Sequence, residues 1–269
     1  EGRVVIVTGA GRGIGRAHAL EFARQGAKVV VNDLGVAADG QDATEGPAHE
    51  VVEEIRAMGG EALANGADVA DWEATRALVA ETIDTFGGLD VVVNNAGFLR
   101  DRMFVSAEED EWDAVVRVHL KGHFCTARHA AEYWRNQSKA GQAVDARIIN
   151  TSSGAGLQGS VGQSAYSAAK GGIVSLTRSA AFALKKYGIN ANCIAPAATT
   201  RMSENVPFEI EAGSPEAIAP LAVWLMSDMA RDVTAQIYTC TGNRIADWNP
   251  PHEIPHMRAE DGEAYTVED

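Results

Sequence analysis

Positive charge is scarce in this sequence. Its 269 residues include 23 lysines and arginines against 37 aspartates and glutamates, which gives a formal net charge of −14. No lysine- or arginine-rich tract interrupts the acidic balance, so a surface that follows the phosphates of a nucleic acid is not expected. We therefore predict no nucleic-acid partner.

Cysteine and long apolar runs are also scarce. Cys125, Cys193 and Cys240 are scattered without a C-x-x-C pair or a metal-ligand spacing, which is typical of core thiols in a reducing compartment. We predict no metal site. No apolar run approaches the length of a bilayer span, and an apolar strand, VVIV, begins at Val4. We accordingly expect no signal peptide, no membrane span and a cytoplasmic protein.

What the sequence does contain is an alternation of short β-branched runs and longer helical patterns. Alternating strands and helices predict βαβ units and a parallel sheet with helices on both faces. The length and the 46% apolar content favour a single domain, residues 1–269. Strands are predicted at Val4–Thr8, Lys28–Asn32, Glu61–Asn65, Val91–Asn94, Arg147–Thr151, Asn190–Ile194 and Gln236–Cys240. Helices are predicted at Gly13–Gln25, Ala48–Met58, Trp72–Phe86, Glu111–Trp134, Ala165–Tyr187 and Pro215–Met229.

Three segments do not fit either pattern. Residues 34–47 are rich in Gly, Asp and Ala and are predicted to form a surface loop. Residues 203–214 are irregular and end at Pro215, which suits the first position of a helix. The segment 245–269 contains three prolines up to Pro255, and we expect an extended C-terminal tail.

The stretch TGAGRGIG, residues 8–15, lies between a predicted strand and a predicted helix. Glycines in this position let the backbone approach a pyrophosphate, and the N-terminus of the helix offers unpaired N–H groups. Ile14 stands where the G-x-G-x-x-G pattern has its third glycine, so the spacing is T-G-x-x-x-G-x-G. A tight turn without a ligand is the alternative interpretation.

Asp33 favours the ligand-binding interpretation. It ends the second predicted strand. Its separation in sequence from the glycine stretch is near that at which an acidic side chain accepts a hydrogen bond from an adenosine ribose hydroxyl. Arg12 could instead pair with the 2′-phosphate of NADP. A carboxylate at about 4 Å from that phosphate costs roughly 4 kcal/mol, whereas an exposed arginine contact returns about 1 kcal/mol or less. We therefore predict NAD as the cofactor.

The stretch YSAAK places Tyr166 and Lys170 four residues apart on one helix face. A tyrosine with an ordinary pKa near 10 is a poor base at neutral pH. A neighbouring ammonium group, together with a positive nicotinamide ring, favours the phenolate and lowers that pKa. The alternative is that both residues lie on an ordinary helix surface. Ser153, just beyond a predicted strand, favours the catalytic interpretation.

The ordered set of motifs resembles the short-chain dehydrogenase/reductase superfamily. TGAGRGIG, Asp68 before Val69, NNAG at 94–97, Ser153, YSAAK and NCIAP at 192–196 follow that family's order along nearly the whole chain. The stretches VVVNDLG, VVVNNAGFLRDRM and VHLKGHF are similar to the (3R)-hydroxyacyl-CoA dehydrogenase domains of peroxisomal type 2 multifunctional enzymes and their single-domain bacterial relatives. The resemblance implies an α/β fold of the Rossmann type, with a doubly wound parallel sheet.

The resemblance also implies roles for individual residues. Ser153 would hold the substrate oxygen, Tyr166 would exchange its proton, and Lys170 would also hold the nicotinamide ribose. His119 stands where the family commonly has asparagine, so it is either a secondary member of a proton relay or a core histidine. The implied cofactor contacts are Gly9, Arg12, Gly13, Ile14, Gly15, Asp33, Asp68, Val69, Asn95, Ala96, Gly97, Tyr166, Lys170, Ile194, Pro196 and Thr200. Asn94 could simply tie neighbouring strands together.

The substrate stays open between related lipids. The resemblance implies NAD-dependent oxidation of a secondary alcohol, either in a 3-hydroxyacyl-CoA or in a hydroxysteroid or steroid-side-chain thioester. The loop 203–214 would form the outer pocket wall, with apolar candidates at Phe98, Leu99, Leu157, Val161, Met202, Val206 and Phe208. Arg100, Arg102 and Arg201 could bind CoA phosphates. Helices with more than one apolar face indicate a homo-oligomer, and the family implies a tetramer. A non-catalytic NAD-binding sensor or scaffold is the rival interpretation.

Overall fold

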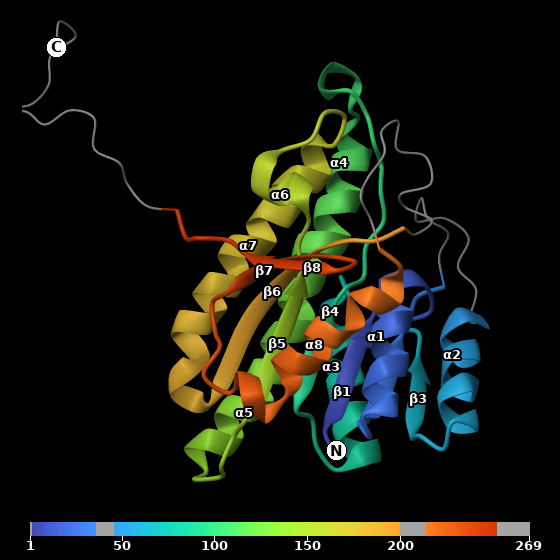
Figure 1. The fold of residues 1–269 in the computed structure, drawn as a ribbon, viewed down its shortest axis with the longest axis vertical. Helices are drawn as coiled ribbons and strands as arrows, with labels where there is room; N and C mark the ends of the chain where they lie inside the picture. The colour runs from blue at the N-terminus through green and yellow to red at the C-terminus, as the bar shows by residue number, and fades with distance from the viewer. Residues whose placement is uncertain (1, 36–45, 200–212, 252–269) are drawn as a thin grey trace, which may run out of the picture.

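The strands form one sheet in the order β3-β2-β1-β4-β5-β6-β7-β8, parallel throughout except for the antiparallel pair β7 and β8. The computed structural model describes residues 2–35, 46–199 and 213–251 (Figure 1). The strands are β1 (Val4–Thr8), β2 (Lys28–Asn32), β3 (Ala62–Asn65), β4 (Val91–Asn94), β5 (Ala146–Thr151), β6 (Ile189–Ala197), β7 (Ile237–Thr241) and β8 (Arg244–Asp247). The predicted α/β fold with a doubly wound sheet is confirmed.

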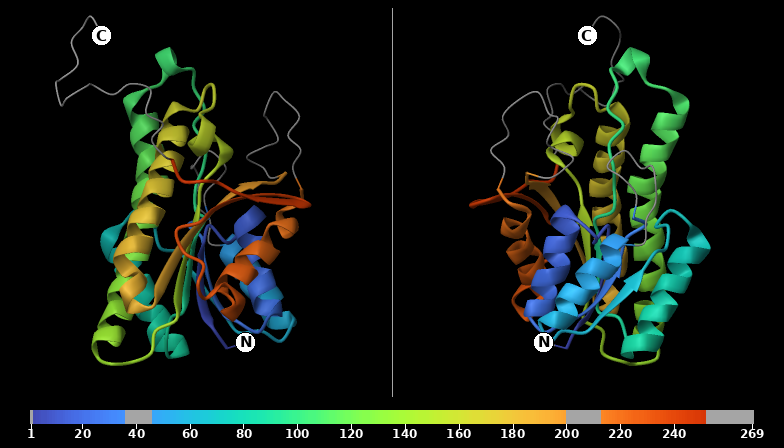
Figure 2. Two further views of the ribbon diagram at one scale, coloured as in Figure 1. Left: turned by 60° about the vertical axis from the view of Figure 1, so that its left-hand side comes forward. Right: turned by 90° about the vertical axis from the view of Figure 1, so that its right-hand side faces the viewer.

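Helices cover both faces of the sheet (Figures 1 and 2). The α-helices are α1 (Gly13–Arg24), α2 (Gly46–Ala57), α3 (Trp72–Phe86), α4 (Glu109–Val116), α5 (Gly122–Lys139), α6 (Gly154–Gln158), α7 (Ser164–Leu184) and α8 (Ala219–Met226). A π-helical turn, η2 (Arg117–Lys121), joins α4 to α5. Short 3₁₀ turns are η1 (Phe104–Ser106), η3 (Lys185–Tyr187), η4 (Pro215–Ala217) and η5 (Asp228–Ala230).

The core lies in two layers because each central strand is buried on both faces. Val5 and Val7 of β1 point to one side and pack with apolar residues of α1, α2 and α8. Ile6 points to the other side, where residues of α3, α5 and α7 meet it. Continuous valine and isoleucine runs are typical of parallel strands covered in this way. Trp134 of α5 closes the second layer, and its indole nitrogen donates to the Leu89 carbonyl at 2.6 Å.

The strand order reverses between β1 and β4. Such a reversal opens a crevice at the carboxyl ends of the strands, where ligands bind in open α/β sheets. β1 ends at Thr8, β4 at Asn94 and β5 at Thr151. Three predicted motifs therefore meet at one edge of the sheet, namely the glycine turn, NNAG and Ser153.

Several predicted bounds were wrong, and each has a local reason. The helix predicted at Glu111–Trp134 begins at Glu109, where Glu108 and Glu111 form a capping box, and it is interrupted by the π turn before ending at Lys139. The helix predicted at Pro215–Met229 is three short pieces, because η4 and η5 flank a brief α8. Pro215 does stand at the first position of η4.

The predicted tail begins inside a strand. Ile245 pairs with Cys240 in the antiparallel ladder of β7 and β8, so the extended segment starts after Asp247. Gly242 has a φ of 50° in the two-residue turn between Thr241 and Arg244, as a hairpin turn of this length requires. The rest of the tail beyond 251 lies outside the described residues. Among the helices in the described part of the chain, none combines the length and apolarity needed to cross a bilayer.

Candidate functional site

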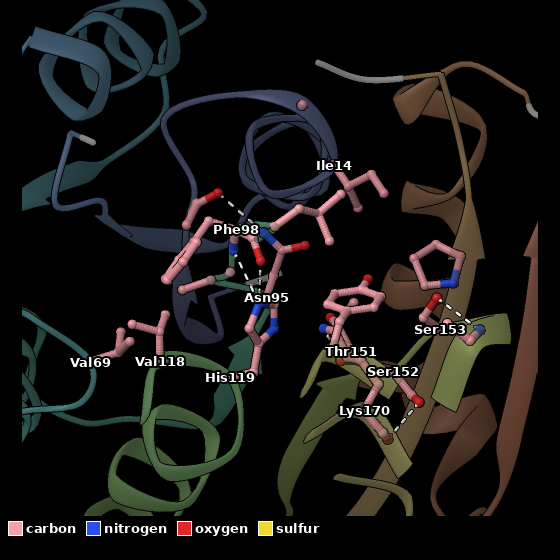
Figure 3. A pocket seen from close by; sticks show the side chains of 18 of the residues that line it. Ile14, Val69, Asn95, Phe98, Val118, His119, Thr151, Ser152, Ser153 and Lys170 are labelled. Carbon is pink, nitrogen blue, oxygen red and sulfur yellow. Dashed lines mark hydrogen bonds between the residues drawn. The ribbon is translucent and has the colours of Figure 1, made fainter. Parts of the chain in front are cut away.

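A pocket of about 870 Å³ runs along the carboxyl ends of the central strands (Figure 3). It collects residues from the glycine turn, from the ends of β2, β4 and β5, and from the π turn and α7. The sequence-predicted residues that line it are Gly9, Arg12, Gly13, Ile14, Asp33, Asp68, Val69, Asn95, Ala96, Gly97, His119, Ser153, Tyr166, Lys170 and Pro196. The fold thus brings most of the predicted site into a single hollow.

Three predicted contacts are not among the lining residues. Ile194 is 1% exposed in β6 and packs into the core layer beside α8. Gly15 lies behind the turn, where an added Cβ would come 2.1 Å from the Gly9 carbonyl oxygen, so it serves packing. Thr200 lies outside the described residues, as does most of the predicted substrate loop 203–214.

The glycine turn leaves backbone donors exposed to the pocket. Gly9 and Gly13 have φ values of 63° and 55°, in the left-handed region that side chains disfavour. An added Cβ at Gly9 would lie 2.7 Å from Cα of Ala96. No side chain caps the N-terminus of α1 at Arg12. Its first N–H groups are therefore available to an anionic group such as a pyrophosphate.

Asp33 is fixed at the end of β2. One carboxylate oxygen accepts the Gly11 N–H at 2.8 Å, and the other accepts the Gly35 N–H at 2.7 Å. Both bonds hold the charge beside the glycine turn, where the sequence predicted a ribose contact. Asp68 is held as well, since its carboxylate pairs with Arg117 at 2.6 Å.

Lys170 is buried on the wall formed by α7, and 3% of it is exposed. Its ammonium nitrogen donates to the Thr151 carbonyl at 2.7 Å and lies 5.5 Å from the centroid of the Tyr166 ring. The backbone oxygen of Lys170 in turn accepts from the Ser152 hydroxyl at 2.9 Å. α7 is thereby fastened to the end of β5 at the level of the two predicted catalytic groups.

Ser153 begins α6 and faces the same space. Its hydroxyl oxygen caps the helix by accepting the Ala155 N–H at 3.3 Å (Figure 3). Gly156 lets α6 lie against α7, because an added Cβ there would come 2.6 Å from backbone and side-chain carbons of Lys170. Ser153, Tyr166 and Lys170 therefore share one wall of the pocket.

The pKa values of the buried pair are set mainly by burial. Desolvation lowers the pKa of Lys170 to about 8, so the lysine still carries its charge at neutral pH. Burial raises the pKa of Tyr166, a hydrogen bond with Ser153 lowers it, and the charge of Asp101 raises it. Burial therefore opposes the acidification of Tyr166 that the sequence predicted, and the hydrogen bond with Ser153 favours it.

His119 sits in the π turn between Phe98 and Tyr166. Its Nε2 lies 3.1 Å from the backbone nitrogen of Phe98 and 2.7 Å from the carbonyl oxygen. Its ring meets the Tyr166 ring edge to face at 5.2 Å. Burial, and secondarily the charge of Lys170, lowers the pKa of His119 to about 3, so the ring is neutral. His119 is thus a hydrogen-bonded buried histidine and a pocket residue at once.

The π turn that holds His119 interrupts the helix between α4 and α5. The Gly122 N–H donates to both the Arg117 and the His119 carbonyls, which spreads one helical turn over five residues. Turns of this type occur frequently at functional sites. His123, the next turn along, was missed: it is buried, and its ring accepts the Thr151 N–H at 3.4 Å. Its spacing of four residues from His119 was the available signal.

Other candidates divide between pocket and scaffold. Asn94 ties β4 to β5, which agrees with the simpler interpretation, since its side-chain amide donates to Asn150 at 2.9 Å. Phe98 and Leu99 line the pocket, while Leu157 packs against a small core cluster instead. Outside the described residues lie Arg201, Met202, Val206 and Phe208, which fall between positions 200 and 212. Among the arginines, Arg100 lines the pocket and Arg102 pairs with Glu111 at 2.8 Å.

The sequence and the fold were compared with known proteins. A sequence profile described as short chain dehydrogenase matches residues 3–209. Hydroxyacyl-CoA dehydrogenase ChsB1 of Mycobacterium tuberculosis is 46% identical over 93% of this chain and 81% of its own. Mouse peroxisomal multifunctional enzyme type 2 is 47% identical over 86% of this chain, which spans only 31% of that enzyme. A short chain dehydrogenase structure from Mycobacterium avium superposes with a TM-score of 0.90 at 56% identity, covering 100% of this chain and 91% of that one.

Proposed function

Since the chain belongs to the short-chain dehydrogenase family and is an oxidoreductase of the kind that uses a nicotinamide cofactor, we propose that it oxidises the secondary alcohol of a 3-hydroxyacyl-CoA with NAD. The observation that carries the proposal is the shared pocket wall of Ser153, Tyr166 and Lys170 beside an uncapped glycine turn. Such a wall gives one substrate oxygen a donor, a proton acceptor and a nearby cation.

The residues of the chain fit a dinucleotide. The exposed N–H groups of α1 suit the pyrophosphate, and Asp33 suits the adenosine ribose. Asp68, Val69 and the NNAG backbone would line the adenine side, and Pro196 would meet the nicotinamide end. Asp33 is charged and points to the same turn as Arg12, which supports NAD over NADP. When bound, the dinucleotide supplies the acceptor for hydride.

The reaction requires two bonds to break together. The Ser153 hydroxyl donates a hydrogen bond to the substrate oxygen and orients it. Tyr166 must be in its phenolate form to accept the hydroxyl proton at its phenolic oxygen while the carbon–hydrogen bond gives up hydride and the carbonyl forms. Lys170 holds a positive charge within 5.5 Å of the Tyr166 ring and would also hold the ribose. His119 excludes water from the far side of that ring, since it is buried and packed against it.

The names of the similar proteins favour the acyl-CoA substrate. The relative from Mycobacterium tuberculosis is a hydroxyacyl-CoA dehydrogenase, and this chain spans most of its length. The match to the larger mouse enzyme covers only part of that protein, so only the dehydrogenase step is proposed here. A hydroxysteroid or a steroid-side-chain thioester stays the second candidate, because the apolar pocket wall at Phe98 and Leu99 would accept either.

The proposal is tested by following NADH absorbance with a panel of alcohols. The purified protein is given NAD and, in separate reactions, a (3R)-hydroxyacyl-CoA, its enantiomer and a 17β-hydroxysteroid. We expect the highest kcat/KM for the (3R)-thioester. A higher value for the steroid would favour the second candidate, and NAD binding without turnover of any alcohol would favour a non-catalytic sensor or scaffold.

A further inference from the structure

Two loops join above the substrate end of the pocket. The loop after β4 and the loop between α6 and α7 pair at Arg102 and Gln163. The Arg102 N–H donates to the Gly162 carbonyl at 2.8 Å, and the Gln163 amide donates to Asp101 at 2.9 Å. The Arg102 side chain is anchored to Glu111 of α4. The pair is therefore a fixed part of the molecule and not two independent loops (Figures 1 and 2).

Large apolar side chains stand exposed on this joined pair. Met103 is 60% exposed, Phe104 81%, Val105 93% and Val161 86%. We call these four residues the apolar rim. Exposed apolar side chains are common singly, but a contiguous group fixed in place marks a binding surface. None of the four takes part in the core clusters of the described residues, so packing does not account for them.

The rim continues the pocket wall outward. Leu99 and Arg100 line the pocket just before the rim begins at Met103, and Ser160 lines it just before Val161. The start of the first loop is tied down, because the Phe98 backbone is hydrogen-bonded to the buried His119 ring, whose Nε2 accepts from the Phe98 N–H or donates to its carbonyl according to the tautomer. A hydrocarbon leaving the pocket past the joined loops would meet the rim directly.

The size of the pocket favours such an exit. Pockets of roughly 300 to 1,000 Å³ enclose ligands of drug size. The pocket here, about 870 Å³, would have to hold the dinucleotide as well as the reacting end of the substrate. A long acyl chain or a steroid ring system would then extend beyond the lining residues.

We propose that the apolar rim binds the hydrocarbon part of the substrate that extends out of the pocket, so that the enzyme selects long-chain or ring-bearing thioesters over short ones. The inference rests on the proposed function and adds the class of substrate. A hydrocarbon is favoured over a second copy of the chain as occupant because the rim is continuous with the pocket wall.

The test compares thioesters of different length. The double variant Phe104→Ser with Val105→Ser is assayed with 3-hydroxyhexadecanoyl-CoA and with 3-hydroxybutyryl-CoA. We expect kcat/KM for the long substrate to fall about tenfold or more, because burial of one large apolar side chain is worth at least that factor. The value for the short substrate should stay within about twofold of the wild type.

The control is Met229→Ser, which removes an equally exposed apolar side chain, 77% exposed, from η5. η5 follows α8 and lies away from the pocket-lining residues. This variant should leave both substrates unchanged. An equal loss for both chain lengths in the rim variant, or no loss for either, would overturn the proposal.

A binding measurement separates failure of the rim from failure of the proposed oxidation. Palmitoyl-CoA lacks the reacting hydroxyl, and its Kd is measured by titration calorimetry in the presence of NAD. We expect the rim variant to bind it about tenfold more weakly, whether or not any alcohol is turned over. Unchanged affinity for palmitoyl-CoA would show that the rim does not bind the substrate. A changed oligomeric mass of the rim variant by light scattering would instead assign the rim to contacts between copies of the chain.

Discussion

Lys170 is buried, and its surroundings explain why it can stay charged. Its ammonium group has a carbonyl partner in Thr151, and its pKa of about 8 leaves it protonated at neutral pH. Tyr166 is buried too, and its pKa is raised. A hydrogen bond with Ser153 favours the phenolate and partly offsets the effect of burial on the Tyr166 pKa.

Asp33 provides a prediction about the cofactor. Asp33→Asn removes the charge but keeps an oxygen that can accept the Gly11 N–H. We expect the ratio of kcat/KM with NADP to that with NAD to rise by about tenfold or more, because a repulsion of roughly 4 kcal/mol is relieved. Glu50→Gln, at an exposed position on α2, is the control that removes an acid without touching the pocket. A wild type that already prefers NADP would contradict the charge argument.

His18 provides a prediction about acid stability. It is buried in α1, and burial lowers its pKa from 6.5 to about 4. Between these two values the unfolded chain binds a proton that the folded chain does not, so stability falls as the pH falls through this window. The loss attributable to His18 is on the order of 3 kcal/mol at most.

The measurement is urea denaturation of the wild type and of His18→Leu at about pH 7.5 and about pH 5. Leucine has no titrating group, so the variant should lose less stability than the wild type between the two pH values. If both proteins lost the same amount, the buried imidazole would not be a source of the acid sensitivity.

At the scale of elements, the π turn explains why position 97 is glycine. The His119 ring lies over Gly97, and an added Cβ would come 2.1 Å from Cε1 of the ring. Gly97→Ala should push His119 away from Phe98 and from Tyr166, and we expect kcat to fall about tenfold or more. NADH formation by the variant is the measurement.

Gly66→Ala is the matched control, because an added Cβ there meets nothing within 4 Å. It should leave both kcat and the melting temperature within error of the wild type. Normal turnover in Gly97→Ala would mean that the ring can move without cost, and the contact with Tyr166 would then have no catalytic weight.

Some helices and strands could be predicted from the sequence and others could not. Strands such as Val4–Thr8 and Val91–Asn94 were predicted with their observed bounds because they are continuous β-branched runs. The short helix α6 was missed because two of the five residues in GAGLQ are glycines, which disfavour helix, and the segment is too short for a periodic pattern. β8 was missed although Gly242 and Asn243 between two short runs are a hairpin signal.

The site could be predicted better than its electrostatics. Ser153, Tyr166 and Lys170 follow motif order, and the motif positions fell into one pocket. The direction of the Tyr166 pKa could not be predicted, because it depends on how completely the surrounding elements bury the ring. His123 and the pocket residues of α6 depend likewise on packing between helices that sequence spacing does not encode.

At the scale of the whole molecule, exposed apolar side chains on the outer helices support the expected assembly. Trp112 and Phe124 are 43% and 44% exposed, and Phe182 of α7 is 76% exposed. We predict a homotetramer, with a mass by multi-angle light scattering of four times the 28.4 kDa chain. Phe182→Glu should lower that mass, because a charge would be buried between copies. A 28.4 kDa wild type at micromolar concentration would contradict the prediction.

The central claim is that Tyr166 exchanges the substrate proton. The direct measurement is kcat for oxidation of a (3R)-hydroxyacyl-CoA by Tyr166→Phe, with Tyr187→Phe in η3, beyond the end of α7, as the control. We expect kcat to fall at least about a hundredfold in Tyr166→Phe, far more than the affinity for NAD, and to stay unchanged in the control. Near-normal turnover by Tyr166→Phe would contradict it.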